Sequence, residues 1–221
     1  ASFNGKGYEV IWANEIDEKA SETYKLNFDH QLVTDDIHNI ASKDIPDMDV
    51  LLAGFPCQAF SVAGYRKGFE DERGNVFFQV ARVLRDKRPS VVFLENVKNL
   101  VSHDKGNTFR IILETLHQYG YHVKHKVLNA SEYGNIPQNR ERIYVVGFIE
   151  KDAYKNFEFP DPFPLTKALK DVVDFNNKVD DKYYYTKEKY KFYDKLEEAI
   201  VRQDTLYQWR RVYVRENKSN L

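Results

Sequence analysis

The single cysteine of the chain lies where a thiol could act as a nucleophile. Cys57 stands between Pro56 and Gln58, directly after the apolar run 50–53, and a glycine-bearing loop follows it. A thiol at such a junction can be exposed and lie near the amino end of the next segment, which lowers its pKa. A lone cysteine is more commonly a small buried hydrophobic residue. The local sequence leaves both interpretations open.

Acidic and basic side chains border two further apolar runs. Glu95 comes directly out of the run 91–94, so its carboxyl group can share or donate a proton beside a dry strand. A capping acid for the next turn is the alternative. Arg140 and Arg142 precede the run 143–149, and side chains two apart in an extended segment point the same way. Both guanidinium groups can therefore face one anionic or carbonyl-rich group, unless they belong to a surface ion-pair cluster.

A third acidic position follows the first predicted strand, at residues 10–13. Glu15 and Asp17 come directly after it, where α/β proteins place ligands at the carboxyl ends of strands. A carboxylate there commonly accepts hydrogen bonds from ribose hydroxyl groups. A solvated acid at the entrance of a helix explains Glu15 equally well.

These residues need a scaffold, and the chain indicates an α/β fold. Short apolar runs alternate with amphipathic stretches, which is typical of βαβ units and a mostly parallel sheet. Strands are expected at 10–13, 50–53, 91–94, 121–127 and 143–149. Helices are expected from about 17 to 27, between 76 and 88, and around 109–116. The segment 61–74 is predicted to be a long functional loop.

Composition limits the class of protein. The 221 residues are 42% hydrophobic and 30% charged, which excludes a disordered or collagen-like chain. With 33 basic and 34 acidic side chains the net charge is −1, so a polyanionic partner must meet a local basic patch. No apolar run approaches the roughly 20 residues of a membrane span, and no signal peptide opens the chain. A cytoplasmic protein is expected, without a metal, because the six histidines match no zinc pattern.

The chain changes character near residue 159. Residues 1–158 carry the α/β pattern, and 159–166 contain three of the seven prolines, which suggests a linker. Beyond it, 167–221 are rich in tyrosine, lysine and aspartate with weak periodicity. We interpret this part as the start of a further region.

Three short motifs together resemble the C5-cytosine DNA methyltransferase family. Residues 54–58 (GFPCQ) are similar to its nucleophile motif, 95–97 to its ENV motif, and 138–142 (QNRER) to its QxRxR motif. They occur in the family's order and spacing, between about residues 7 and 148. The compact spacing resembles the bacterial or phage restriction-modification type. The resemblance implies a Rossmann-like S-adenosylmethionine-dependent methyltransferase fold, with helices on both faces of the sheet.

The resemblance also implies a role for each residue singled out above. Cys57 would add to C6 of a cytosine flipped out of duplex DNA, which makes C5 nucleophilic toward the methyl group of S-adenosylmethionine. Glu95 would hold or supply a proton at N3. Arg142, with Arg140 nearby, would bind the base carbonyl oxygen and orient Glu95, and Asn96 would support the loop that carries Cys57.

Further positions resemble the family's cofactor site. Glu15 would bind the ribose hydroxyl groups while Ile16 packs on the adenine, and Asp36 would accept from the adenine amino group. Ile37 accompanies Asp36, and the remaining apolar wall would consist of Pro56 and Val76. The expected product is S-adenosylhomocysteine.

The chain departs from the family pattern at both ends. The family's glycine-rich FxGxG turn and first strand are missing from 1–158, and 167–221 resemble only the start of a target-recognition region. The expectation is thus a catalytic domain incomplete at both ends, acting as a monomer on double-stranded DNA in the bacterial cytoplasm. An inactive nucleic-acid-binding fragment, or a family member that methylates tRNA, are the alternatives.

Overall fold

The computed structural model describes residues 7–57, 76–174, 176–202 and 205–216. The loop expected at 61–74 lies outside this range. The chain forms two compact units, Ala1–Val127 with Arg142–Phe159, and Leu128–Glu141 with Pro160–Leu221. The division into a catalytic domain, a linker at 159–166 and a recognition region remains a prediction.

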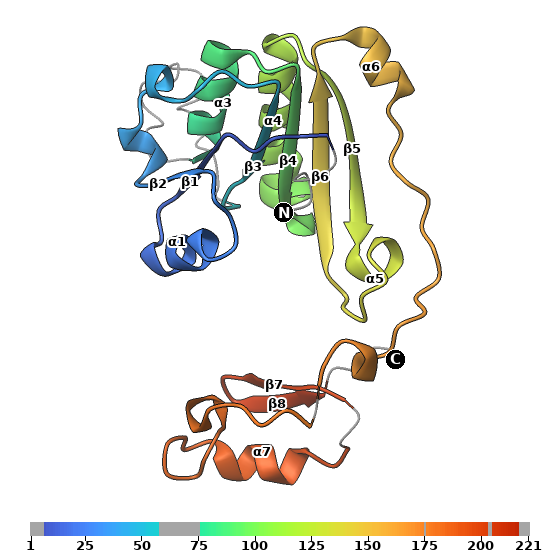
Figure 1. Cartoon of the computed structure of the whole chain (residues 1–221). Helices are drawn as coiled ribbons and strands as arrows, with labels where there is room; N and C mark the ends of the chain where they lie inside the picture. The colour runs from blue at the N-terminus through green and yellow to red at the C-terminus, as the bar shows by residue number, and fades with distance from the viewer. Residues whose placement is uncertain (1–6, 58–75, 175, 203–204, 217–221) are drawn as a thin grey trace. The chain divides into compact units, whose positions relative to one another are not determined.

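Strands and helices alternate along most of the chain (Figure 1). The strands are β1 (Trp12–Glu15), β2 (Gln31–Thr34), β3 (Val50–Gly54), β4 (Val91–Val97), β5 (His122–Asn129) and β6 (Glu141–Phe148). Among the described residues up to 156, the α-helices are α1 (Glu18–Lys25), α3 (Val76–Lys87), α4 (Asn107–Gln118), α5 (Ala130–Tyr133) and α6 (Lys151–Asn156). This pattern confirms the predicted α/β class.

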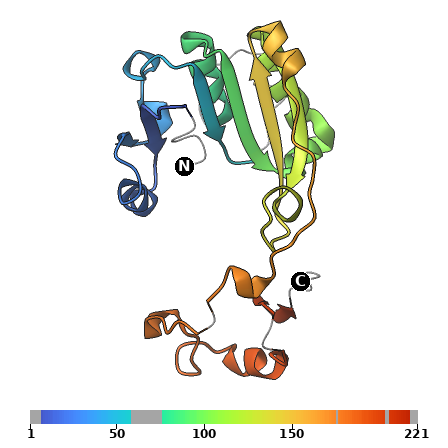
Figure 2. The same ribbon diagram turned by 45° about the vertical axis from the view of Figure 1, so that its right-hand side comes forward.

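The larger sheet has the strand order β3-β4-β6-β5, and β1 pairs with β2 in a separate parallel sheet (Figure 2). Strand β3 runs parallel to β4, but β6 runs antiparallel to it. The larger sheet of the predicted α/β fold is therefore mixed, with β6 as an antiparallel strand. The physical reason is that β6 starts beside the carboxyl end of β4, with Arg142 opposite Val97, without first crossing back over the sheet.

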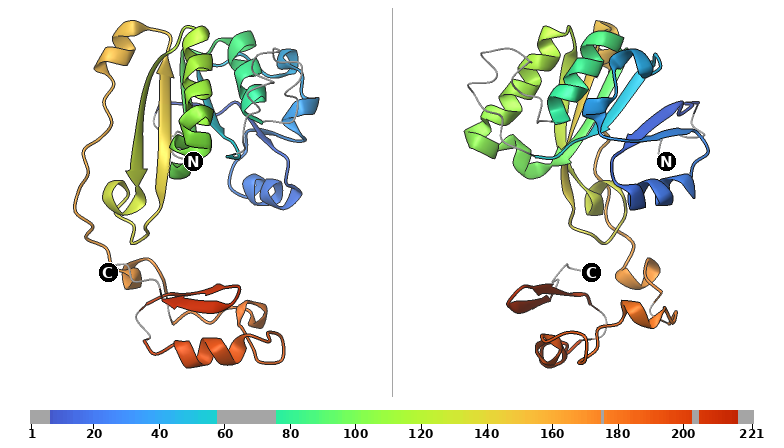
Figure 3. Two further views of the ribbon diagram at one scale, coloured as in Figure 1. Left: turned by 180° about the vertical axis from the view of Figure 1, so that it is seen from behind. Right: turned by 90° about the vertical axis from the view of Figure 1, so that its left-hand side faces the viewer.

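Helices lie on both sides of the strands. Helices α3 and α4 lie on one side of the larger sheet and α1 lies on the other (Figure 3). The side chains of α3, α4 and the sheet face that they cover form one apolar cluster. It includes Phe77, Leu84, Leu94, Ile112, Leu116 and Ile143. Burying this cluster holds the ends of β3 and β4 in fixed positions.

Two strand boundaries differ from the sequence expectation. Strand β1 is shifted to Trp12–Glu15, so Glu15 is its last residue. Strand β4 continues to Val97 because its pairing with β6 extends to the end of the ENV motif. Successive strand residues point to opposite faces, and Asn96 is accordingly buried whereas Glu95 is only half-buried.

The second unit contains α7 (Tyr193–Ala199) and the antiparallel hairpin of β7 (Tyr207–Arg210) and β8 (Tyr213–Glu216). One face of the hairpin is packed, since the Trp209 ring stacks on Phe192 with centroids 4.5 Å apart. None of the described helices is long and apolar enough to span a membrane.

Candidate active site

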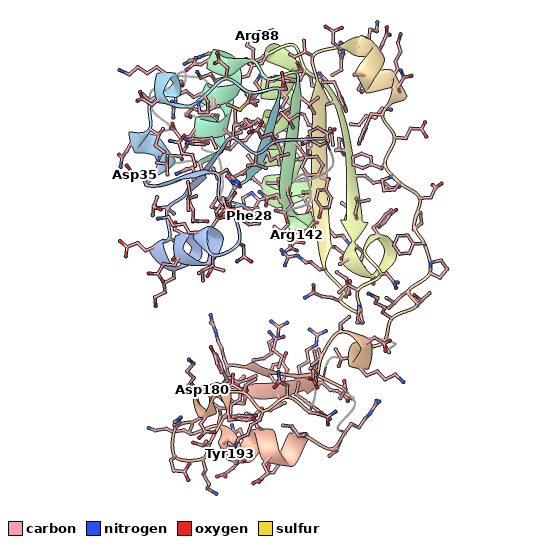
Figure 4. The ribbon with its side chains drawn as sticks, viewed as in Figure 1. Phe28, Asp35, Arg88, Arg142, Asp180 and Tyr193 are labelled. Carbon is pink, nitrogen blue, oxygen red and sulfur yellow. The ribbon has the colours of Figure 1, made fainter. Side chains whose placement is uncertain are left out.

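An ion pair joins two of the three motifs at the carboxyl end of β4. The Arg142 guanidinium Nε lies 3.0 Å from Glu95 Oε1. The two residues are diagonal neighbours on antiparallel strands, because Glu95 is opposite Tyr144 and Arg142 is opposite Val97. Figure 4 shows Arg142 at one end of the strands and Arg88 at the other. The guanidinium thus fixes one carboxylate oxygen.

The other face of β4 joins the ENV motif to the cysteine motif. The Asn96 side-chain amide donates a hydrogen bond of 2.6 Å to the main-chain oxygen of Phe55, and its own oxygen accepts from Val97 N at 2.8 Å. Asn96 and Phe55 are both buried. Asn96 therefore holds the chain two residues before Cys57.

Cys57 lies at the border of the apolar core. It is partly buried and packs against the cluster formed by α3, α4 and the sheet. Gly54 is the register partner of Glu95, and three Cα–Cα steps span at most about 11 Å, so the backbone at Cys57 stays close to the ENV motif. Burial raises the pKa of the Cys57 thiol, in contrast to the lowered pKa that its junction position suggested. The thiol of the free protein is therefore protonated at neutral pH.

Arg140 does not belong to the same compact unit as Arg142. It lies in the segment Leu128–Glu141, which groups with the second unit. Its main-chain N–H donates to Asn129 Oδ1 at 3.0 Å, and its side chain is exposed. A shared role of the two arginines remains a prediction.

The predicted ribose and adenine acids lie at adjacent strand ends. Glu15 ends β1, and its main-chain oxygen accepts from Asp35 N at 3.1 Å, which is the residue before Asp36. Glu15 Oε1 accepts from the N–H groups of Ile16 and Asp17, at 2.9 and 3.0 Å. The side chain is thereby held at the end of the strand by its own loop.

Asp36 is held in a similar way by the residues that follow it. Its Oδ1 accepts from the backbone N–H of His38 at 2.9 Å and contacts His38 Nδ1 at 2.5 Å. The backbone hydrogen bond and then the imidazole contact lower the pKa of Asp36, which is therefore a charged acceptor at neutral pH. Two carboxylates at neighbouring strand ends suit the hydroxyl and amino donors of an adenosine group.

The apolar positions of the predicted cofactor site differ in exposure. Ile16 is 63% exposed, whereas Ile37 packs against the small cluster of Ile40, Ile45 and Val83. Val76 begins α3 and packs against the main cluster, and Pro56 is exposed. An exposed isoleucine beside a fixed carboxylate provides an apolar surface for a flat ring. These positions therefore fit an adenosine-containing cofactor.

Arg82 contacts this region without any motif in the sequence that marks it. Its guanidinium donates to the main-chain oxygens of Ile37 and Ile40, at 3.1 and 2.8 Å. The one local signal is the i, i+3 spacing from Gln79, whose side-chain oxygen accepts from Arg82 Nε at 2.9 Å. The partners in residues 37–40 are distant in sequence, which is why the pattern alone does not reveal the contact.

Comparisons with known proteins identify the family of the chain. Residues 1–220 match the family described as C-5 cytosine-specific DNA methylase. The chain is 58% identical over 221 residues to the Type II methyltransferase M.Bsp6I of Bacillus sp. (strain RFL6), covering 99% of this chain and 70% of that protein. It is 50% identical over 167 residues to M.HhaI of Haemophilus parahaemolyticus, covering 76% of this chain. The match spans only 50% of M.HhaI.

Solved structures show the same fold at lower sequence identity. A DNMT2 mutant from Spodoptera frugiperda superimposes with a TM-score of 0.61 at 23% identity, covering 79% of this chain and 54% of that one. Dnmt2 from S. pombe gives 0.57 at 23% identity, over 77% of this chain and 55% of that one. The likeness confirms the predicted Rossmann-like methyltransferase fold.

Proposed function

Because the chain belongs to the C-5 cytosine-specific DNA methylase family, we propose that it transfers a methyl group from S-adenosylmethionine to C5 of a cytosine in double-stranded DNA. The named Type II relatives favour a role in a bacterial restriction-modification system. The bacterial cytoplasm and a monomeric acting form are part of this proposal.

The proposed chemistry begins at the cysteine. C5 of cytosine is a poor nucleophile within an aromatic ring, and addition of the Cys57 sulfur to C6 makes it enamine-like. Stacking shields C6 in a duplex, so the target base has to rotate out before the sulfur reaches it. Because burial keeps the thiol protonated in the free protein, the substrate complex has to promote loss of its proton.

Glu95 and Arg142 are proposed to act on the base. As the sulfur adds at C6, the proton lost by the Cys57 thiol passes through the Glu95 carboxylate to N3, so that negative charge does not accumulate on the ring. Arg142 Nε lies 3.0 Å from Glu95 Oε1, and the guanidinium is proposed to bind a carbonyl oxygen of the nucleobase. After methylation the C5 proton leaves to solvent, the C6–S bond breaks, and the proton on N3 returns through Glu95 to restore the thiol.

The cofactor contributes an electrophilic methyl group on a sulfonium sulfur. Glu15 and Asp36 are proposed to accept hydrogen bonds from its adenosine part, with Ile16 and Ile37 beside the ring. Pro56 and Val76 line the rest of the site in this proposal.

A basic hairpin face supports DNA as the substrate. In the β7–β8 register, Gln208 is opposite Arg215 and Arg210 is opposite Tyr213, and all four side chains are exposed. The opposite face is occupied by packing of Trp209 on Phe192. A two-stranded ribbon that presents arginine and glutamine fits the major groove of DNA, where these side chains pair with guanine and adenine.

The observation that carries the proposal is the ion pair between Glu95 and Arg142 beside the cysteine motif. The test is covalent trapping on a mixed-sequence duplex in which 5-fluorocytosine replaces every cytosine. Release of the enzyme requires loss of a proton from C5, and fluorine stands in place of that proton. With S-adenosylmethionine present, we expect a protein–DNA adduct whose peptide maps to Cys57. Cys57→Ser should abolish it, and Glu95→Gln should lower its rate at least 100-fold.

Lys155→Ala is the matched control, since it removes a surface ion pair with Asp152 of similar length, 3.1 Å, and should leave trapping unchanged. An adduct that survives Cys57→Ser would overturn the assignment of the nucleophile. A fluorinated tRNA transcript tested in parallel decides the substrate, because trapping on tRNA alone would contradict the DNA assignment.

A further inference from the structure

We propose that Arg82 is a positioning residue for cofactor binding, which sets the place of the segment Asp36–Ile40, here called the adenine turn. The inference rests on the proposed function, because it takes Asp36 as the acceptor for the adenine amino group. What it adds is a residue on α3 that determines whether Asp36 can perform that role.

The contacts of Arg82 reach the adenine turn from a different element. The Nη2 group donates to the main-chain oxygens of Ile37 and Ile40, at 3.1 and 2.8 Å. The Nη1 group donates to Ser42 Oγ at 2.7 Å, just beyond the turn. One guanidinium thus spans the turn and the residues that follow it.

The turn itself is short, and its internal hydrogen bonds close only one 3₁₀ turn. Asp36 caps a single 3₁₀ turn, Ile37–Asn39, and Asn39 N donates to its main-chain oxygen at 2.9 Å. Such a short turn has little stability of its own, so contacts with α3 are expected to fix its position. Moving the Ile37 carbonyl moves Asp36 directly, because the two residues are adjacent in the chain.

The next residue of α3 contacts the same turn through apolar packing. Val83 is buried in one cluster with Ile40 and Ile45, and Ile37 packs against it. Helix α3 is anchored in the main core by its other face, which includes Phe77 and Leu84. The helix is therefore a rigid support, and Arg82 is its polar connection to the turn.

An arginine is needed for this geometry. The Arg82 side chain donates four hydrogen bonds to residues that the structure describes, the fourth from Nε to Gln79 Oε1 at 2.9 Å. A lysine ammonium group in its place has three N–H donors at one point and cannot reach acceptors spread on two sides of a planar fork. Lysine should therefore retain the charge but only part of the positioning.

The experiment measures binding of S-adenosylhomocysteine by calorimetry to the protein and to Arg82→Met, Arg82→Lys and Asp36→Asn. A second ligand has purine in place of adenine and lacks the amino group that Asp36 would bind. We expect Arg82→Met to weaken S-adenosylhomocysteine at least tenfold and the purine analogue less than threefold. Arg82→Lys keeps the charge and is included in case Arg82→Met does not fold. Its affinity for S-adenosylhomocysteine should lie between those of the unmodified protein and Arg82→Met.

A double substitution separates positioning from general stability. If Arg82 acts through Asp36, Arg82→Met combined with Asp36→Asn should bind S-adenosylhomocysteine within about twofold of Asp36→Asn alone. The control Arg110→Met removes an arginine whose partner is Glu114 on the same helix, at 2.6 Å, and should leave affinity unchanged.

Two results would overturn the inference. One is that Arg82→Met weakens the binding of both ligands equally. The other is that the double variant loses affinity by the product of the two single losses. Failure of the proposed function would show differently. In that case the unmodified protein would not bind S-adenosylhomocysteine saturably, or Asp36→Asn would bind it as tightly as the unmodified protein does.

Discussion

The side-chain amide of Asn96 donates a buried 2.6 Å hydrogen bond to the carbonyl oxygen of Phe55, which connects the ENV motif to the cysteine motif. We expect Asn96→Asp to lower the rate of adduct formation at least tenfold. It should also lower the free energy of unfolding by about 2 kcal/mol, because a carboxylate would then face a buried carbonyl and both groups only accept. Trapping and urea denaturation measure the two effects.

Asn27→Asp is the control for this change. The Asn27 amide also donates to a main-chain oxygen, that of Thr23 at 2.7 Å, but this contact is exposed and Asn27 lies just after the end of α1. Normal trapping by Asn96→Asp would show that the bond to Phe55 does not support the cysteine segment.

The raised pKa of the Cys57 thiol predicts slow alkylation at neutral pH. Because the thiolate is the reactive form and burial disfavours it, the rate with iodoacetamide should rise with pH and reach half its maximum above the usual value of about 8.5. The chain has one cysteine, so labelling reports this thiol alone. The same protein in urea provides the reference, and a folded-state midpoint below that of the unfolded chain would contradict the prediction.

Tyr121 predicts a loss of stability at alkaline pH. Its buried hydroxyl donates to Pro89 O at 2.7 Å, and burial raises its pKa to about 12. The tyrosine of the unfolded chain ionises near pH 10, so the contribution of neutral Tyr121 to the free energy of unfolding is fully present below pH 10. It is lost as the pH rises toward 12, at up to about 1.4 kcal/mol per pH unit.

Tyr121→Phe should therefore make the free energy of unfolding less dependent on pH between 10 and 12, as measured by urea titrations. Tyr183→Phe is the control, because that side chain is 68% exposed, and it should leave the dependence unchanged. An equal pH dependence in Tyr121→Phe and the unmodified protein would be inconsistent with a buried, neutral Tyr121.

The exposed hairpin face predicts salt-dependent DNA binding. Replacing Arg210 and Arg215 by alanine should weaken binding and reduce the slope of log K against log salt by about 1–2, because two positive charges that displace counterions from the DNA are lost. Fluorescence anisotropy at several salt concentrations measures this slope. The control replaces Lys182 and Lys187, two lysines of the same unit that pair with Asp180 and Asp194. Equal slopes for the two double variants would rule out a specific role of the hairpin face.

Much of the scaffold could be predicted because local signals determine it. Asp17 begins α1 as its cap, with Oδ1 accepting from Ala20 N at 2.8 Å, and the apolar face of α3 is buried as its spacing indicates. The direction of β6 could not be read in this way, because an apolar run has no orientation. The extension of β4 to Val97 also depends on its partner strand rather than on its own residues.

The candidate site could likewise be predicted only in part. Motif order identifies Cys57, Glu95 and Arg142 as candidates, but the 3.0 Å contact between the last two depends on strand register. The contacts of Arg82 could not be predicted from the sequence, because its partners lie about 40 residues upstream, in a turn without a regular pattern.

The opposite orientations of Glu95 and Asn96 make one strand serve two purposes. Deletion of a single residue between Val91 and Leu94 would turn the Glu95 carboxylate toward the apolar core and the Asn96 amide toward solvent. Catalytic competence and correct folding would then fail together, so this stretch tolerates exchange of side chains far better than any change in its length.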